Sequence, residues 1–252
     1  MSGERRVAVV TGAASGLGVA ITARLADDGA HVIALDRDDA VNDVVARLSK
    51  SGGSAEAAIV DLSVEDEIFA FTEVLKARHG RWDILVNNAG ILPKLDGKAV
   101  PTETTPMSQW HQVIAVNLTA PFILCRQALP LMVERGFGRI VNIASRAART
   151  YVVTSGAHYG ATKAGLVGMS RMIAGEHAKD GITVNCIAPG RFETPMSERG
   201  STEWLASLKA TIPVGRTGHP EELAAMVSYL AGDESGFVTG AVFDINGGTF
   251  MG

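Results

Sequence analysis

Cysteine is scarce in this sequence, and long apolar runs are missing. Only two of its 252 residues are cysteine, Cys125 and Cys186, and both lie in apolar surroundings. That count excludes a disulfide framework and a cysteine metal cluster, and it suits buried thiols in a reducing compartment. No stretch approaches the 18 or so apolar residues of a membrane span, and the N-terminus lacks a secretory apolar run. We therefore expect a cytoplasmic protein without a membrane segment.

Positive charge and histidine pairs are also lacking. The formal net charge is −4, which argues against the basic surface that nucleic-acid-binding proteins carry. The six histidines form no HExxH motif or short-spaced pair, so we expect no metal site.

Glycine, by contrast, is abundant: it makes up 28 of the 252 residues, or about 11%, whereas its usual share in proteins is about 7%. Short β-branched runs alternate with longer helical patterns along the whole chain, and most of these runs are continuously apolar, as in strands buried on both faces. This alternation predicts one α/β domain over residues 1–252, a Rossmann-like, doubly wound parallel sheet with helices on both faces. Its seven expected strands are Val7–Val10, His31–Leu35, Ala55–Val60, Trp82–Val86, Arg139–Ala144, Ile182–Ile187 and Ala241–Ile245.

Glycines also stand where helices should end, at Gly29, Gly80, Gly136 and Gly181, and the segment from Ser63 to Asp66 suits a helix start. Residues 88–106 and 188–201 look irregular and follow expected strands. Loops after strand ends surround the ligand crevice of such sheets. We expect the substrate pocket to be formed by the loops 88–106, 145–158 and 188–201.

The first expected strand runs into a glycine-rich turn, TGAASGLG, and a helix follows at once. Glycines allow a sharp turn and a close approach of the backbone to a ligand, and the helix N-terminus attracts a pyrophosphate. This context predicts a dinucleotide site, although a purely structural turn is the alternative. Its contacts would be Gly12, Ser15, Gly16, Leu17 and Gly18.

Asp36 ends the second strand, about 20 residues after the glycines. A carboxylate there can accept hydrogen bonds from the adenosine ribose and would repel a 2′-phosphate, so NAD is the expected cofactor. Arg37 could instead hold that phosphate, but the turn offers no second basic partner. Asp61 and Leu62, after the third strand, are candidates for the adenine, and helix capping is an equal alternative for Asp61.

With these elements in view, the sequence resembles the classical short-chain dehydrogenase/reductase family over nearly its whole length. The resemblance rests on the order and spacing of TGAASGLG, NNAG at 87–90, Asn117, Ser145, Tyr159, Lys163, PG at 189–190 and DINGG at 244–248. It implies a catalytic set of Asn117, Ser145, Tyr159 and Lys163. Further cofactor contacts follow from it at Asn88, Ala89, Gly90, Tyr159, Lys163, Pro189, Gly190, Phe192 and Thr194.

The spacing suits this chemistry, because Tyr159 and Lys163 lie one helical turn apart on the same face. A nearby ammonium favours the phenolate, so we expect Lys163 to lower the pKa of Tyr159 toward that of a general base. Ser145 would hydrogen-bond the reacting oxygen. By resemblance, Lys163 also binds the nicotinamide ribose, and Asn117, within a long helix, holds a water for proton exchange.

Two positions depart from the family pattern. Ser145 and Tyr159 stand 14 positions apart, one more than is usual, which an extra loop residue would accommodate. Phe192 replaces the more common aliphatic residue but keeps the backbone contact.

The substrate stays open. Arg146, Arg149, Arg191 and His158 flank the catalytic positions and would favour an anionic substrate, or they are ordinary loop residues. An apolar wall is the opposing indication, with candidates Ile91, Leu92, Tyr151, Val152 and Val153.

The expected helix Gly160–Ala178 has little polar surface on any face. One face must cover the sheet, and the other suggests packing against a second subunit or cover by the chain's own C-terminal segment. The resemblance implies a homotetramer, or less often a homodimer.

These observations predict an NAD(H)-dependent oxidoreductase that interconverts a secondary alcohol and a ketone, with Tyr159 as general acid/base and a small alcohol or ketone as substrate. Two alternatives remain at this point: an epimerase or dehydratase that retains its NAD, and a non-catalytic nucleotide sensor on the same fold.

Overall fold

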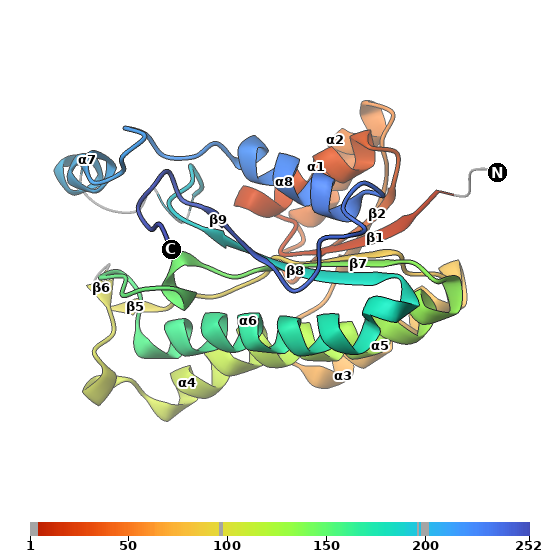
Figure 1. The fold of residues 1–252 in the computed structure, drawn as a ribbon, viewed down its shortest axis with the longest axis horizontal. Coiled ribbons are helices and arrows are strands. Elements are labelled where there is room, and N and C mark those ends of the chain that lie inside the picture. Colours follow the sequence, from red (N-terminus) through yellow and green to blue (C-terminus); the bar gives the residue numbers. More distant parts are fainter. Residues whose placement is uncertain (1–4, 96–97, 196, 198–201) are drawn as a thin grey trace.

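A computed structural model describes residues 5–95, 98–195, 197 and 202–252 of the chain, and it is built around one seven-stranded sheet (Figure 1). All six pairings between neighbouring strands are parallel, and the strand order is β3-β2-β1-β4-β7-β8-β9. The strands are β1 (Val7–Thr11), β2 (His31–Asp36), β3 (Ser54–Ile59), β4 (Ile84–Asn87), β7 (Gly138–Ile143), β8 (Ile182–Pro189) and β9 (Val242–Ile245).

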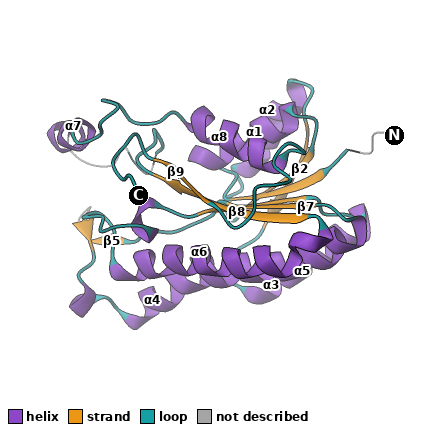
Figure 2. Ribbon diagram, in the orientation of Figure 1, coloured by secondary structure: helices purple, strands orange, loops and turns teal. Residues whose placement is uncertain are grey.

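Helices cover both faces of the sheet, as Figure 2 shows. One layer holds α1 (Gly16–Asp27), α2 (Val41–Lys50) and α8 (Pro220–Ala231). The opposite layer holds α3 (Glu65–His79), α4 (Met107–Ile114), α5 (Ala120–Arg135) and α6 (Ala157–His177). A further helix, α7 (Thr202–Ala210), stands at one end of the molecule. The predicted doubly wound, single-domain fold is confirmed.

Burial explains why the central strands are mostly apolar. Every residue of β1, β4, β7 and β8 is buried, because helices pack on both sides of them. Two large apolar clusters result, one on each side of the sheet, and Val9 and Val10 of β1 belong to opposite clusters.

Strand ends fall within one or two residues of the expected positions. The largest differences are of two residues: β4 begins at Ile84 rather than Trp82, whose side chain is fully buried just before the strand, and β8 runs to Pro189 rather than Ile187. Helix α6 begins at Ala157, three residues before the expected Gly160.

The expected irregular segment 88–106 contains short regular elements. A two-stranded hairpin forms from β5 (Lys94–Leu95) and β6 (Lys98–Ala99), and a 3₁₀ turn covers Thr102–Thr104. Residues 96–97 of this predicted pocket loop, and residues 196 and 198–201 of the loop 188–201, lie outside the described residues.

Glycines end three of the helical segments as expected. Gly80, Gly136 and Gly181 each follow a helical segment in the left-handed conformation. Helix α3 begins at Glu65, within the expected start Ser63–Asp66 and with acidic residues in its first turn. Val64 is its N-cap residue, and the Ser63 hydroxyl donates to Asp61 Oδ1 at 2.7 Å.

One continuous helical run, Met107–Arg135, is long and apolar enough to cross a membrane by length and composition. Half of its apolar window is buried inside the protein, where α5 packs on the sheet and contributes Leu124, Ala128 and Met132 to the core. The run therefore has the placement of a core helix.

Candidate active site

A cleft of about 980 Å³ opens at the carboxyl ends of the strands. The strand order reverses direction between β1 and β4, and ligands of open α/β sheets bind at such a switch point. Residues of all three predicted pocket loops line the cleft, within 88–94, 145–155 and 189–197, together with the glycine turn and the ends of β2 and β3.

Thr11, the last residue of β1, joins the two halves of this switch point. Its buried hydroxyl oxygen accepts hydrogen bonds from the backbone N–H groups of Asn88 and Ala89, each at 3.0 Å. The Asn88 amide in turn donates to the carbonyls of Thr11 and Gly12, at 2.9 and 3.1 Å. The sequence reading missed the role of Thr11; its only signal was a hydroxyl at the strand end directly before the glycines.

The glycine turn needs its glycines for two different reasons. Gly12 and Gly16 have φ angles of 67° and 55°, a left-handed conformation that other residues adopt at a cost. Gly18 lies outside the described lining of the cleft; a Cβ there would lie 1.9 Å from the Gly12 carbonyl oxygen, so its role is helix packing. Ser15 and Leu17 line the cleft beside Gly16.

The Asp36 carboxylate is fixed at the end of β2 and lines the cleft. Its Oδ2 accepts from the Ala14 N–H of the glycine turn at 3.0 Å, and its Oδ1 accepts from Asp38 N–H at 3.1 Å. The second lone pairs on these oxygens stay available for ribose hydroxyls. Arg37 lines the same end of the cleft.

Asp61 and Leu62 also line this end, directly after β3. Hydrogen bonds from the Ser63 backbone and hydroxyl to Asp61 lower the pKa of its carboxyl group below the usual value. Asp61 therefore carries a negative charge at the adenosine end of the predicted site.

The loop after β8 brings its predicted contacts to the glycine turn. A Cβ on Gly16 would lie 3.3 Å from Thr194 Cγ2, so this loop closes over the turn. Phe192 lines the cleft while its ring packs against Gly218, where a side chain would clash at 2.6 Å. Gly218 thus explains how an aromatic residue fits there. Pro189 and Gly190 also line the cleft.

Tyr159 and Ser145 meet in the cleft despite their 14-residue separation. Ser145 follows β7, and its Oγ accepts from Ala147 N–H at 3.1 Å, which fixes a short 3₁₀ turn over Arg146–Ala148. Burial raises the pKa of the Tyr159 phenol above its usual value, and a hydrogen bond with Ser145 opposes that rise. The expected net lowering of this pKa by Lys163 is therefore wrong for the chain alone, because burial dominates.

Lys163 lies one turn along α6, with its Nζ 5.8 Å from the centre of the Tyr159 ring. The ammonium donates to the Ile143 carbonyl at 2.7 Å and is only 3% exposed. Burial lowers the pKa of Lys163 to about 8. Gly90 passes so close that a Cβ there would lie 3.3 Å from Nζ.

Asn117 sits in a π-helical turn, Ala115–Thr119, between α4 and α5 rather than in a regular helix. Its buried amide is committed to the cleft loop: Oδ1 accepts from Ile91 N–H at 2.8 Å, and Nδ2 donates to the Ile91 carbonyl at 3.0 Å. Asn117 therefore positions the backbone beside Gly90 and Lys163. Its predicted water-holding role stays a prediction.

Comparisons with known proteins agree with this geometry. The sequence model for enoyl-(acyl carrier protein) reductases matches residues 12–249. The chain is 37% identical over 246 residues to the 3-oxoacyl-[acyl-carrier-protein] reductase FabG of Thermotoga maritima, covering 97% of this chain and 98% of that protein. The chain belongs to the short-chain dehydrogenase/reductase (SDR) family.

Several similar solved structures carry bound nicotinamide cofactors, among them the following two. A 3-oxoacyl-[acyl-carrier protein] reductase of Brucella melitensis with NAD is 35% identical, with a TM-score of 0.90 over 99% of this chain and 92% of that chain. An actinorhodin polyketide ketoreductase with NADPH is 37% identical, with a TM-score of 0.89 over 97% of each chain.

The cleft of this SDR protein fits such a cofactor. Gly12 and Gly16 line the cleft without a side chain, α1 begins at Gly16 within that lining, and the fixed Asp36 carboxylate stands at the expected ribose end. The residues that would hold it are those of the turn, Asp36, the loop 88–90 and the loop 189–194.

The residues flanking the site divide into two groups. Arg146 and Arg191 line the cleft with Ile91, Leu92, Val152 and Val153, whereas Tyr151 is 83% exposed. Arg149, His158 and Tyr151 are absent from the lining that the described residues form.

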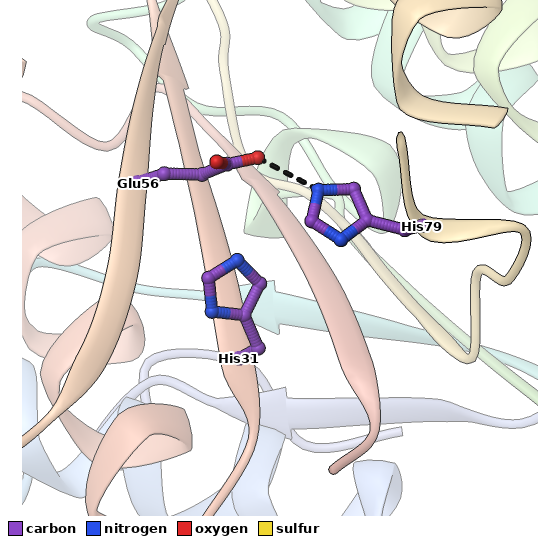
Figure 3. A group of neighbouring side chains, drawn as sticks. All are labelled: His31, Glu56 and His79. Carbon is purple, nitrogen blue, oxygen red and sulfur yellow. Dashed lines mark hydrogen bonds and ion pairs between the residues drawn. The ribbon is translucent and has the colours of Figure 1, made fainter. Parts of the chain in front are cut away.

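A cluster of titratable side chains lies away from the cleft, where β2, β3 and the end of α3 meet (Figure 3). The ligand atoms of His31, Glu56 and His79 lie within 4.8 Å of one another, a cluster that the sequence did not predict. Glu56 accepts from His79 Nε2 and pairs with Arg78, both at 2.9 Å. The charge of Arg78 opposes a cation there. These contacts fix the edge strand to α3.

Replacing Lys163 with methionine tests whether burial of the Lys163 ammonium destabilises the folded chain. The ammonium is charged in both the folded and the unfolded chain below pH 8, so its burial cost is present in full there. Between pH 8 and the unfolded pKa of about 10.5 the folded chain loses the proton first, and the cost disappears. We expect Lys163→Met, without cofactor, to raise the free energy of unfolding by roughly 1–2 kcal/mol at pH 7, allowing for the lost hydrogen bond.

Denaturant unfolding at pH 7 and at pH 10 measures this gain, which should shrink at the higher pH. The exposed Lys179→Met is the matched control and should show no such trend. A Lys163→Met difference that is equal at both pH values would contradict the assignment.

Proposed function

We propose that this SDR protein transfers a hydride between NAD(H) and a secondary alcohol or ketone. The observation that carries the proposal is the meeting of Ser145, Tyr159 and Lys163 in the same cleft as the glycine turn. The solved relatives with bound NAD and NADPH support a nicotinamide cofactor.

In the oxidation direction, the substrate hydroxyl loses its proton to the Tyr159 oxygen while its carbon loses a hydride, leaving a ketone. The Ser145 hydroxyl donates to the substrate oxygen and holds it against Tyr159. The Lys163 ammonium stabilises the phenolate form of Tyr159 by its charge. The bound cofactor supplies the hydride acceptor, or the donor in the reverse reaction.

The two alternative functions are not favoured. The matched relatives include reductases and dehydrogenases, and this chain matches them over nearly their full length. A nucleotide sensor would have no need of Tyr159 and Lys163 together, since burying this lysine is costly.

NAD rather than NADP is the proposed cofactor, because of Asp36. Its carboxylate is held by Ala14 and Asp38, so it cannot swing away from a 2′-phosphate without losing two hydrogen bonds. Arg37 beside it is the opposing feature, but Ala14 and Ser15 add no second positive charge.

A homotetramer, or a homodimer, is the proposed assembly. Phe122 on α5 and Met172 on α6 are 50% and 66% exposed, in the helical layer on one side of the sheet. Large apolar side chains exposed on the same helical layer suit a subunit contact, and the mass in solution is the direct check. The two buried free thiols suit the proposed cytoplasmic location.

Replacing Tyr159 with phenylalanine tests the reaction. A panel of polyols, sugar acids, cyclic alcohols, steroids and 3-hydroxyacyl thioesters, followed by NADH absorbance, identifies substrates. With any of them, Tyr159→Phe should lower kcat/KM by about 10²–10⁴-fold, because the general acid/base is lost. NAD affinity should change little. Turnover that survives this substitution would reject Tyr159 as the acid/base.

Cofactor choice is tested separately by titrating NAD and NADP into the protein. We expect NAD to bind at least about tenfold more tightly, from one charged hydrogen bond gained and one repulsion avoided. Asp36→Ala should narrow that ratio, whereas Asp39→Ala, outside the cleft lining, should keep it. Tighter binding of NADP by the unmodified protein would overturn the proposal.

A further inference from the structure

Four basic residues flank the catalytic positions in sequence, and the fold gives two of them partners elsewhere. Arg149 donates to the Gly252 carbonyl at 2.8 Å and lies over the Phe250 ring, so it fastens the C-terminal segment. His158 is buried, with Nε2 2.7 Å from the Gln109 amide and Nδ1 accepting from Tyr159 N–H. Neither side chain is available to a ligand in the cleft.

Arg191 lines the cleft but is also engaged. It donates to the Ser197 carbonyl, and its guanidinium lies 5.6 Å from the centre of the Trp204 ring on α7. Burial lowers the pKa of Arg191, as expected for a guanidinium held against protein. These contacts assign Arg191 to holding the loop after β8.

Arg146 is different. It directly follows Ser145, it lines the cleft, and its side chain is half-buried. Its guanidinium makes no hydrogen bond or ion pair with the residues that the structure describes. A guanidinium offers five N–H donors in a planar fork, so a half-buried one beside a reacting group calls for an acceptor.

The charges of the cleft are segregated in a way that suggests what this acceptor is. The carboxylates among its described lining residues all belong to the ends of β2 and β3, the adenosine end of the proposed site. The catalytic end carries cations and no carboxylate among those residues. The carboxylates are those of Asp36, Asp38 and Asp61, with Arg37 as the one cation at their end among the described lining residues. The cations of the catalytic end are Lys94, Arg146, Lys163 and Arg191.

Apolar side chains complete the catalytic end. Ile91 and Leu92 come from the loop after β4, and Val152 and Val153 from the loop after β7. A substrate here meets apolar contacts along its carbon chain and positive charge at one side. A guanidinium without a protein partner is well suited to bind a single carboxylate, whose two oxygens can each accept one of its N–H groups.

We propose that Arg146 forms an anion subsite beside Ser145 that takes the carboxylate of the substrate, which is therefore a hydroxy acid or its oxo acid. This assignment rests on the proposed alcohol–ketone function and adds the substrate class. Arg146 acts in binding; Tyr159 and Ser145 act on the reacting oxygen.

The test compares acids with their own amides, which keep shape and lose charge. Gluconate is paired with gluconamide, and 3-hydroxybutyrate with 3-hydroxybutyramide, with kcat/KM measured by NADH formation. For at least one pair we expect the unmodified protein to favour the acid by about 10- to 100-fold, as a charge-assisted pair provides. Arg146→Gln should bring that ratio near one, mainly through KM, and Arg146→Lys should restore part of it.

Arg47→Gln is the matched control, since Arg47 is an exposed arginine of α2 outside the cleft lining, and it should leave the ratio unchanged. Equal use of acid and amide by the unmodified protein overturns the subsite and leaves the proposed function standing. No NAD-linked turnover of acids, amides or any alcohol in the wider panel rejects the function itself.

Two further outcomes would also overturn the proposal. A loss of NAD affinity in Arg146→Gln as large as the loss in kcat/KM would place the guanidinium on the cofactor. A preference for phosphorylated polyols over hydroxy acids that disappears with Arg146→Gln would assign the subsite to phosphate.

Discussion

The site depends on one buried hydroxyl, that of Thr11. It accepts two backbone N–H groups from the start of the loop after β4, and so it holds the ends of β1 and β4 together at the point where the strand order reverses. The Asn88 N–H also donates to the Val86 carbonyl at 3.1 Å, whereas the Ala89 N–H has no other acceptor among the described residues. Without the hydroxyl, that one partly buried N–H would be unpaired, at a cost of about 1–3 kcal/mol. The open glycine turn and the loop that carries Gly90 are thereby fixed relative to each other.

The loop that begins at this junction also contacts the catalytic groups. Gly90 passes beside the Lys163 ammonium, and Asn117 holds the next residue, Ile91, by both its N–H and its carbonyl. Lys163 and Tyr159 are placed in a buried setting where burial disfavours the charged form of each. Burial of this ionisable pair beside the cleft lowers the stability of the folded chain, and such destabilising groups are common in active sites.

Much of this could be predicted from the sequence, because it depends on local pattern. The continuous apolar runs indicated strands buried on both faces, and the i, i+4 spacing of Tyr159 and Lys163 placed them on one helix face. The left-handed Gly12 and Gly16 followed from the turn they form. Family resemblance then supplied Ser145 and Asn117, which periodicity alone would not distinguish from ordinary cap or core residues.

The remainder required tertiary structure. Arg146, Arg149 and Arg191 look alike in sequence, yet Arg149 is fastened to the C-terminus, about 100 positions away, and Arg191 to its own loop and α7. The raised pKa of Tyr159 could not be predicted either, since burial outweighs the opposing hydrogen bond with Ser145. The π-helical turn at Asn117 has no signal in the amino-acid pattern.

The central claim is that the Thr11 hydroxyl organises the dinucleotide site, and calorimetric NAD affinity of Thr11→Val against Thr11→Ser tests it most directly. Valine keeps the shape and removes the acceptor, whereas serine keeps the hydroxyl. We predict that serine retains NAD affinity within about threefold and that valine loses about tenfold, because the Ala89 N–H is left unpaired and the Asn88 N–H loses one of its two acceptors. Equal NAD affinity of the two variants would contradict it.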